Sequence, residues 1–369
     1  MKVRIGTRGS DLALWQAHHV KSLFAAVGVE CEIIVLKTRG DVIDDVSLSK
    51  LEGKGFFTAE IERALLDRDV DVAVHSHKDL PTELAPGLVI AAVPARGPQT
   101  ERLLIAPHAH DPSAAFLPLK HGARVGTSAP RRLEQLRTLR PDLDVLDLRG
   151  NVPTRVRKAR EGQYDAVVLA AAGLDRLKLS TEGLIAFDMP IELFVPAPAQ
   201  GALAIQVRAA DRELFDLVRS TMHDDATAHA IEAERSLLSA SGGGCSLPVA
   251  AALVRDGADL RPGNFPPPTT GGRSARGAGN AASAETWTAY AFLGAGHPVG
   301  AVHGRWSVTR GAEPRAAIAA ALAQLSTGAA THIGPLGGLR VALTGTAADG
   351  SVLGERLAAL GASVVLESV

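Results

Sequence analysis

The sequence has little cysteine, no long apolar run and almost no net charge, and each of these absences excludes a class of protein. Its 369 residues include two cysteines, Cys31 and Cys245, too few and too far apart in sequence for a disulfide framework. No apolar run reaches the length of a membrane helix, and residues 1–6 resemble a strand that enters a turn rather than a secretory segment. We therefore expect a cytoplasmic protein with no membrane role.

The formal net charge of −1 argues against a general nucleic-acid binder, yet the charge is unevenly distributed. Residues 120–160 contain eleven Lys and Arg against four Asp and Glu, an excess of seven positive charges. A concentration of guanidinium groups in one segment favours an anionic ligand.

Strands and helices alternate through the first half of the chain. Short apolar strands are predicted at 3–6, 32–36, 70–75, 123–126, 144–148 and 166–170, and helices begin near Ser10, Thr58, Pro130 and Pro153. Strands separated by helices predict parallel pairing with right-handed crossovers. Ligands of such sheets bind at the carboxyl ends of the strands. The sequence therefore predicts an α/β protein with two lobes, and the apolar strand at 202–207 is expected to leave the second lobe and return to the first.

The last third of the chain predicts a smaller α+β unit. A helix at 226–240, strands at 249–254, 287–293 and 301–308, and a helix at 314–325 follow one another, so the strands should form an antiparallel sheet. Residues 257–285 are rich in Gly, Pro, Ser and Ala and form an insertion. Residues 331–369 resemble a linker followed by a strand at 339–343, a helix near 351–360 and a strand at 363–366. One β-α-β unit of this kind cannot bury a core by itself.

Cys245 follows three glycines and precedes Ser246, Leu247 and Pro248. Glycines allow unusual backbone angles and leave space for a bulky group close to the main chain, while the proline stiffens the exit. The segment is either a loop that presents the thiol to a ligand or a flexible turn in which a cysteine happens to lie.

A second candidate site lies at the end of the strand at 70–75. His75, His77 and Asp79 have the spacing of a zinc site, but Lys78 between them would repel a dication. A polar strand end without function is another interpretation. In the third, Lys78 binds an anion and Asp79 transfers a proton or stabilises a developing cation.

Two loops in the basic segment combine hydroxyl or amide groups with arginines at predicted helix N-termini, which is typical of anion sites. The residues concerned are Thr127, Ser128, Arg131 and Arg132 in the first loop, and Arg149, Asn151 and Arg155 in the second. A solvated basic face is the alternative. Arg137 and Arg140 lie further along the helix, and we expect them to be surface residues.

Taken in order, these motifs resemble the porphobilinogen deaminase family over roughly residues 3–325. The resemblance rests on Gly6-Thr7-Arg8-Gly9-Ser10 with Leu14-Trp15-Gln16-Ala17, Thr38-Arg39-Gly40-Asp41, Gly53-Lys54-Gly55-Phe56-Phe57, His75-Ser76 with Lys78-Asp79, Gly126-Thr127-Ser128 with Arg131-Arg132, Leu148-Arg149-Gly150-Asn151 with Thr154-Arg155, Gln200-Gly201-Ala202, and Gly243-Gly244-Cys245 with Pro248.

The resemblance implies a three-domain fold with two doubly wound lobes like those of periplasmic binding proteins and a small α+β domain with an antiparallel sheet. The first lobe would comprise 1–94 and 195–217, the second 95–194, and the cofactor-attachment domain 218–330, followed by a linker and truncated tail at 331–369. It further implies a transferase of tetrapyrrole and haem biosynthesis that joins four porphobilinogen molecules head to tail on a covalent dipyrromethane cofactor. Each addition releases ammonia, and hydrolysis then frees hydroxymethylbilane.

The resemblance also assigns roles to residues. Cys245 would carry the dipyrromethane, and Asp79 would be catalytic. The residues that would bind cofactor or substrate are Arg8, Ser10, Lys54, Phe57, Lys78, Thr127, Ser128, Arg131, Arg132, Arg149, Asn151, Arg155 and Gln200, and no metal is expected. The sequence departs from the family pattern at His77, where methionine is common, at Ala129-Pro130, and in the segment 97–102, which matches the family's acidic hinge only loosely.

Two other functions remain open from the residues alone. A two-lobed polycarboxylate-binding protein would use the same arginines without Asp79 or Cys245, and a zinc hydrolase would use His75, His77 and Asp79. If the resemblance holds, the partner is porphobilinogen, and we expect a monomer. The tail from Leu339 resembles the beginning of uroporphyrinogen-III synthase, the enzyme to which product would be handed, but it is too short for a working copy.

Overall fold

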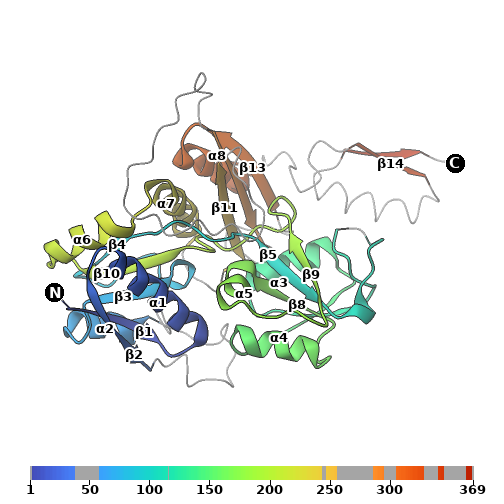
Figure 1. Ribbon diagram of the computed structural model, residues 1–369. Coiled ribbons are helices and arrows are strands. Elements are labelled where there is room, and N and C mark those ends of the chain that lie inside the picture. Colours follow the sequence, from blue (N-terminus) through green and yellow to red (C-terminus); the bar gives the residue numbers. More distant parts are fainter. Residues whose placement is uncertain are drawn as a thin grey trace, which may run out of the picture.

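The computed structural model describes residues 2–37, 58–114, 116–242, 247–255, 286–294, 305–327, 340–344 and 363–367. Three residues of the predicted site, Lys54, Phe57 and Cys245, lie outside these ranges, as do the insertion at 257–285 and the helix predicted near 351–360. Within the described ranges the chain forms two five-stranded sheets, a three-stranded antiparallel sheet and a separate pair of parallel strands (Figure 1).

The first sheet has the strand order β2-β1-β3-β10-β4. Its strands are β1 (Lys2–Arg8), β2 (Glu30–Leu36), β3 (Val72–Ser76), β4 (Leu88–Ala92) and β10 (Leu203–Arg208), and its helices are α1 (Asp11–Ala26), α2 (Ala59–Leu66) and α6 (Arg212–Met222). The strand β1 pairs in parallel with β2 and β3, as predicted. The strand β10 pairs with β3 and β4, which confirms that this apolar strand returns to the first sheet, where all of its residues are buried.

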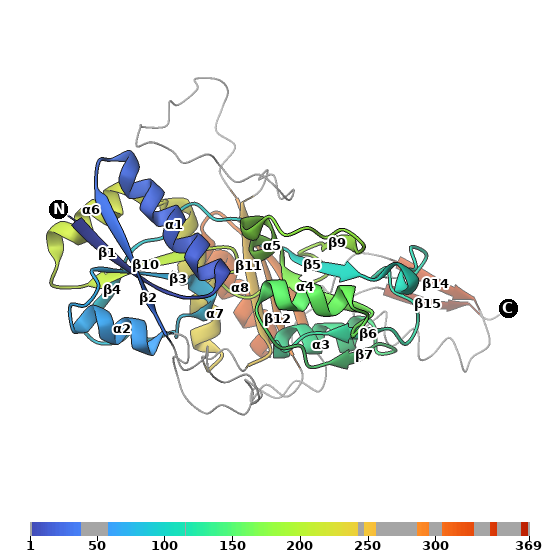
Figure 2. The same ribbon diagram turned by 60° about the horizontal axis from the view of Figure 1, so that its bottom comes forward.

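The second sheet has the order β7-β6-β8-β5-β9. Its strands are β5 (Glu101–Ile105), β6 (Arg124–Gly126), β7 (Asp144–Leu146), β8 (Ala166–Ala170) and β9 (Ile185–Met189), and its helices are α3 (Pro130–Leu139), α4 (Val152–Arg160) and α5 (Ala171–Leu177). The helix α3 follows β6 and the helix α4 follows β7 (Figure 2). The N-termini of these two arginine-containing helices therefore follow the carboxyl ends of the two strands.

The predicted parallel pairing is confirmed for the strands that alternate with helices, β1 with β2 and β3 and β6 with β7 and β8, whereas two strands outside that prediction are antiparallel. In the second sheet β5 runs antiparallel to β8 and β9, and in the first sheet β10 runs antiparallel to β3 and β4. Both strands enter their sheet directly from the other lobe, with no helical crossover from a neighbouring strand. The rule that makes βαβ units parallel therefore does not apply to them.

The two crossing segments, 93–100 and 190–202, pack closely against one another. The amide of Gly97 donates a hydrogen bond to the carbonyl of Gly201 at 3.0 Å. Gly201 has φ of +82°, and a Cβ at this position would lie 2.5 Å from the carbonyl oxygen of Pro98. Only glycine tolerates both the backbone angle and this contact, so Gly201 sets how closely the two connections approach.

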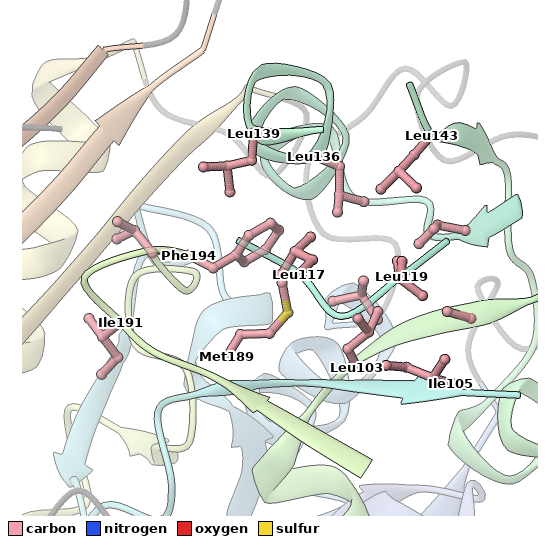
Figure 3. Close-up of a cluster of buried hydrophobic side chains, with 14 of the residues drawn as sticks. Leu103, Ile105, Leu117, Leu119, Leu136, Leu139, Leu143, Met189, Ile191 and Phe194 are labelled. Atoms are coloured by element: carbon pink, nitrogen blue, oxygen red, sulfur yellow. The ribbon is translucent and has the colours of Figure 1, made fainter. Parts of the chain in front are cut away.

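The third sheet consists of β11 (Val249–Arg255), β12 (Trp287–Leu293) and β13 (Arg305–Gly311), all antiparallel as predicted. One face packs on α7 (Asp225–Ala240) and α8 (Pro314–Thr327). From the opposite face, Ala250, Ala252 and Phe292 join the core of the second lobe, which includes Leu136 and Phe194 (Figure 3). The small domain and the second lobe therefore share one hydrophobic core.

The tail contributes two described strands, β14 (Arg340–Thr344) and β15 (Ser363–Glu367), which pair in parallel. Figure 1 shows β14 apart from the three sheets. The predicted strands of the tail are thus confirmed, and the predicted α/β class with a small antiparallel domain is confirmed for the chain as a whole.

Candidate active site

Asp79 lies just beyond the carboxyl end of β3, in a 3₁₀ helix at His77–Asp79. It lines a pocket together with Arg8, Ser10, Gln16 and Ser76. The side chain amide of Gln16 donates to Ser76 Oγ at 2.8 Å, and Ser10 Oγ caps α1 by accepting from the amide of Ala13 at 3.4 Å, so α1 and the end of β3 are held together around the carboxylate.

The surroundings of Asp79 raise the pKa of its carboxyl group. The residue is reachable by water, but protein surrounds it in the pocket, and the loss of hydration disfavours the charged form. The charges of Lys78 and Arg8 oppose this shift. A carboxyl group that is accessible to a ligand and holds its proton more tightly than usual is suited to general acid catalysis.

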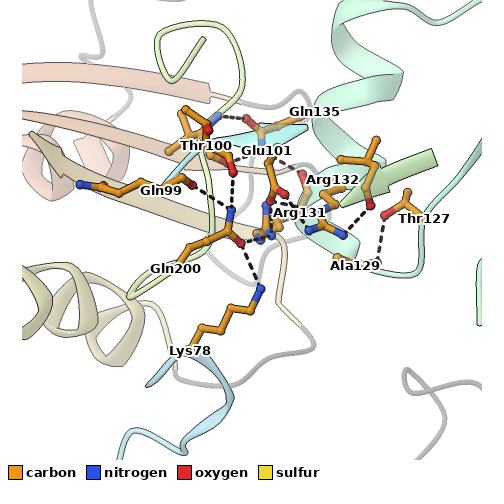
Figure 4. A network of polar contacts seen from close by, with 12 residues as sticks. Lys78, Gln99, Thr100, Glu101, Thr127, Ala129, Arg131, Arg132, Gln135 and Gln200 are labelled. Carbon is orange, nitrogen blue, oxygen red and sulfur yellow. Dashed lines mark hydrogen bonds and ion pairs between the residues drawn. The ribbon is translucent and has the colours of Figure 1, made fainter. Parts of the chain in front are cut away.

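Gln200 connects the two lobes by hydrogen bonds to Lys78, the residue before Asp79, and to Arg131 (Figure 4). Its side chain oxygen accepts hydrogen bonds from Lys78 Nζ of the first lobe at 3.1 Å and from Arg131 Nη2 of the second lobe at 3.4 Å. Its side chain nitrogen donates to the carbonyls of Gln99 at 2.9 Å and Thr100 at 3.3 Å, which fixes the amide orientation. Burial lowers the pKa of Lys78 to about 8, so its charge is lost just above neutral pH.

Glu101, which the sequence analysis did not single out, lies at the centre of the predicted arginine cluster. Its carboxylate is fully buried and contacts Arg131 Nη2 at 2.5 Å and Arg132 Nη2 at 2.7 Å. Arg132 also donates from Nε to Glu101 Oε1 at 3.0 Å and from Nη1 to the carbonyl of Val168 at 3.0 Å. Every nitrogen of the Arg132 guanidinium therefore has a protein partner, whereas the buried Nη1 of Arg131 has none among the described residues.

Three polar residues of the predicted anion loops make hydrogen bonds that shape the loops themselves. Ser128 Oγ donates to the carbonyl of Leu148, and Asn151 Oδ1 accepts from the amide of Thr154 at 3.0 Å as the N-cap of α4. Thr127 Oγ1 accepts from the amide of Ala129 at 3.5 Å.

Arg149 and Arg155 remain available to an anion in part. Arg149 Nε lies 3.0 Å from Asp147 Oδ2, while its buried Nη2 has no hydrogen-bond partner in the described part of the chain. Arg155 donates from Nε to the carbonyl of Gly150 at 2.7 Å. Burial, and to a smaller extent the charges of Arg132 and Arg149, lower the pKa of Arg155 to about 10. A bound anion would oppose this shift by stabilising the charged guanidinium.

Arg140 corrects one expectation of the sequence analysis. Arg137 is exposed as expected, but Arg140 is buried and donates to the carbonyls of Leu117 at 2.9 Å and Leu119 at 3.0 Å. Its charge is paired with Asp142 at 2.8 Å. Arg140 therefore anchors a loop of the second lobe and is not a surface residue.

The histidines near Asp79 do not form a metal site in the structure. The buried His75 Nε2 lies 3.0 Å from Gln206 Oε1, and Gln206 donates to Glu62 Oε1 at 2.8 Å. Burial lowers the pKa of His75 to about 4 and that of His77 to about 3. No group of three or more His, Cys, Asp or Glu in the described ranges is arranged to hold a metal ion.

Arg176 on α5 is another buried cation that the sequence analysis missed. Its Nη2 donates to the carbonyl of Gly201 at 2.6 Å, its Cζ lies 5.5 Å from the ring centroid of Trp15, and burial lowers its pKa to about 10. An arginine in a short helix after an all-apolar strand was the available signal.

Together, the fold and site define a two-lobed α/β protein with an added α+β domain and an accessible carboxyl group at a buried, cation-rich lobe junction. This is an arrangement for a polyanionic organic ligand.

Comparison with known proteins identifies the family. Residues 3–216 match the family described as porphobilinogen deaminase, dipyromethane cofactor binding domain. Porphobilinogen deaminase of Nitratidesulfovibrio vulgaris is 50% identical over 258 residues, which cover 69% of this chain and 79% of that protein. The Syntrophomonas wolfei protein of the same name is 45% identical over 260 residues, covering 70% and 82%. The chain belongs to the porphobilinogen deaminase family.

The family confirms the predicted class of enzyme, a transferase of tetrapyrrole biosynthesis that uses a dipyrromethane cofactor. Among solved structures, the chain is similar to an ancestral cationic amino acid solute binding protein, at 15% identity and a TM-score of 0.37 over 64% of this chain and 94% of that one. A similarity this low carries no functional conclusion. No helix in the described ranges is long and apolar enough to span a membrane.

Proposed function

We propose that this chain assembles four porphobilinogen molecules head to tail with loss of ammonia and then releases hydroxymethylbilane, with Asp79 as the catalytic group. The observation that carries the assignment is Asp79 itself, an accessible carboxyl group with a raised pKa beside Arg8 and Lys78. A protonated carboxyl group can give its proton to the leaving amine. The resulting carboxylate then stabilises the cation that loss of ammonia leaves on the substrate.

The cationic residues of the two lobes fit a dipyrromethane group that carries several carboxylates. The buried Nη1 of Arg131 and Nη2 of Arg149 have no partner in the described part of the chain, and a buried cationic donor without a partner is unfavourable. Carboxylates of the bound group would supply these partners, with Lys78, Arg8 and Arg155 completing the set. When bound, the cofactor supplies the nucleophilic pyrrole carbon to which substrate is joined.

The hydroxyl and amide groups have a supporting role in this proposal. Ser128 and Asn151 hold the loops that carry Arg149 and Arg155, and Gln200 keeps the cations of both lobes at one place. Thr127 lies beside Ser128, and Ser10 caps α1 in the first lobe. Lys54, Phe57 and Cys245 keep the roles implied by the family motifs. The fold division is proposed as 1–94 with 195–217, 95–194, 218–330 and 331–369.

We also propose that the enzyme works as a cytoplasmic monomer, independent of membranes and nucleic acids, and hands its product to a uroporphyrinogen-III synthase. The near-neutral net charge supports the absence of a nucleic-acid partner. Analytical ultracentrifugation tests the oligomeric state directly.

Intact mass measurement of the denatured protein tests the central proposal. The wild-type chain should exceed its sequence mass by one dipyrromethane, and Cys245→Ser should lose both the added mass and the activity, because a serine hydroxyl is a far weaker nucleophile than a thiolate. Cys31→Ser is the matched control and should keep both. An unmodified wild-type chain that only binds polycarboxylates would instead identify a two-lobed binding protein.

A further inference from the structure

Glu101 carries a negative charge at a place where three cations meet. It is the first residue of β5, directly after the crossing segment, and its side chain is 0% exposed. Arg131 and Arg132 contact its carboxylate from α3, and Lys78 approaches from the first lobe through Gln200 (Figure 4). A carboxylate buried so completely is stable only when it is paired, and here two guanidiniums pair with it.

The two arginines differ in how many hydrogen bonds they make to Glu101. Arg132 donates to both carboxylate oxygens, from Nε at 3.0 Å and from Nη2 at 2.7 Å, in the paired geometry that guanidinium and carboxylate prefer. Arg131 shares only one oxygen, through Nη2, and its Nη1 remains without a partner in the described ranges. The pairing thus fixes Arg132 inside the protein and leaves one buried donor of Arg131 for another anion.

We propose that Glu101 is a positioning residue for the anion site: it holds Arg132 as an internal counter-charge, orients Arg131 so that Nη1 is left for a ligand carboxylate, and supplies a negative charge that favours the ammonium form of Lys78. This inference rests on the proposed function, because it concerns the same cation site. It also changes the expected role of Arg132, which acts on Glu101 rather than directly on the ligand.

The pKa of Lys78 provides a measurable test of this role, because an ion pair that only stabilised the fold would not change it. Burial and the two arginines lower the pKa of Lys78, whereas Asp79 and Glu101 raise it. A neutral residue at position 101 would remove one of the charges that keep Lys78 protonated. The pKa of Lys78 should then fall further, and anion binding should be lost at a lower pH.

The experiment compares Glu101→Gln with Glu101→Asp, using intact mass and the pH dependence of kcat/KM for porphobilinogen between about pH 6 and 10. In Glu101→Gln, the alkaline limb should move to lower pH by roughly half a unit or more, and KM should rise about tenfold, more than kcat falls. In Glu101→Asp, the charge remains and the limb should stay in place, while the shorter reach raises KM.

Asp188→Asn is the matched control, since Asp188 on β9 also pairs with an arginine, Arg102, at 2.6 Å but lies outside the cation cluster. This variant should leave the limb and KM unchanged. If Glu101→Gln does not fold, the double variant Glu101→Gln with Arg132→Gln keeps the local charge of the wild type. Its limb should then lie where the wild-type limb lies, and a displaced limb would overturn the proposal.

The outcomes separate this inference from the proposed function. A wild-type chain without added mass or product would contradict the proposed function. A loaded and active wild type, together with a Glu101→Gln variant that has the wild-type limb and KM, would contradict only the role of Glu101.

Discussion

Arg96 on the crossing segment and Glu234 on α7 form a bidentate ion pair, with Nη1 to Oε1 at 2.6 Å and Nη2 to Oε2 at 2.8 Å, that is almost fully shielded from water. Glu234 also accepts from the amides of Ala199 at 2.7 Å and Leu253 at 2.8 Å. One carboxylate therefore connects both crossing segments with the third sheet. The helix that leads toward Cys245 is anchored at the junction of the lobes.

The first prediction concerns this anchor. Glu234→Ala should lower the free energy of unfolding by about 3–5 kcal/mol, because it leaves the Arg96 guanidinium buried and unpaired. Urea denaturation followed by circular dichroism measures the change. Glu161→Ala, which removes the partner of Arg157 in an exposed pair, is the control and should cost less than about 1 kcal/mol. Equal effects of the two substitutions would mean that the buried pair has no special weight.

A second prediction addresses Asp79. Asp79→Asn preserves the shape of the side chain but removes both the proton donor and the negative charge. Turnover should fall at least about a hundredfold, which corresponds to roughly 2.7 kcal/mol of barrier, while the circular dichroism spectrum and unfolding midpoint stay close to those of the wild type. Near-normal turnover would place the catalytic step at another group.

The arginines of opposite lobes should act at different stages of elongation. Arg149→Ala removes a guanidinium of the second lobe whose Nη2 has no partner among the described residues, and it should fail at cofactor assembly or the first additions. Arg8→Ala removes a cation of the first lobe and should accumulate later covalent intermediates. Intact mass after substrate addition resolves the covalent species in each variant. An identical ladder in both, with only a uniformly higher substrate requirement, would show that the arginines act as a general attractive field.

A fourth prediction follows from the buried histidine at position 77. Its native pKa of about 3 lies below the ordinary value of 6.5, because burial and the charges of Arg235 and Arg96 disfavour protonation. Between these two values the unfolded chain binds a proton that the native chain does not, so stability is complete above pH 6.5 and falls as the pH decreases. Because of His77 alone, the free energy of unfolding at pH 5 should be about 2 kcal/mol lower than at pH 7.5.

His77→Met tests this contribution, because methionine has no titratable group. Urea denaturation at pH 7.5 and pH 5 should show a smaller acid loss in the variant than in the wild type, with the other titrating groups common to both. The prediction is wrong if the two proteins lose the same stability over this interval.

The local pattern of the sequence determined most elements of the fold. The apolar runs at 166–170 and 287–293 agree with the observed β8 and β12 residue by residue, and α3 begins at Pro130 as predicted. Strand and helix periodicities are set by side chains a few residues apart, so they can be read without knowledge of the partner elements. The glycines and hydroxyl groups of the ligand loops also form local patterns, so the sequence alone indicates these loops.

Only the tertiary structure decided what each charged side chain contacts. Arg132 and Arg140 lie in the same short segment of the sequence as the exposed Arg137. In the structure, however, Arg132 pairs with Glu101, and Arg140 donates to the carbonyls of Leu117 and Leu119. The antiparallel course of β5 and β10 likewise depends on the chain's crossing between lobes. These partners are brought together by packing of distant segments, and charge in a sequence carries no information about which distant group will neutralise it.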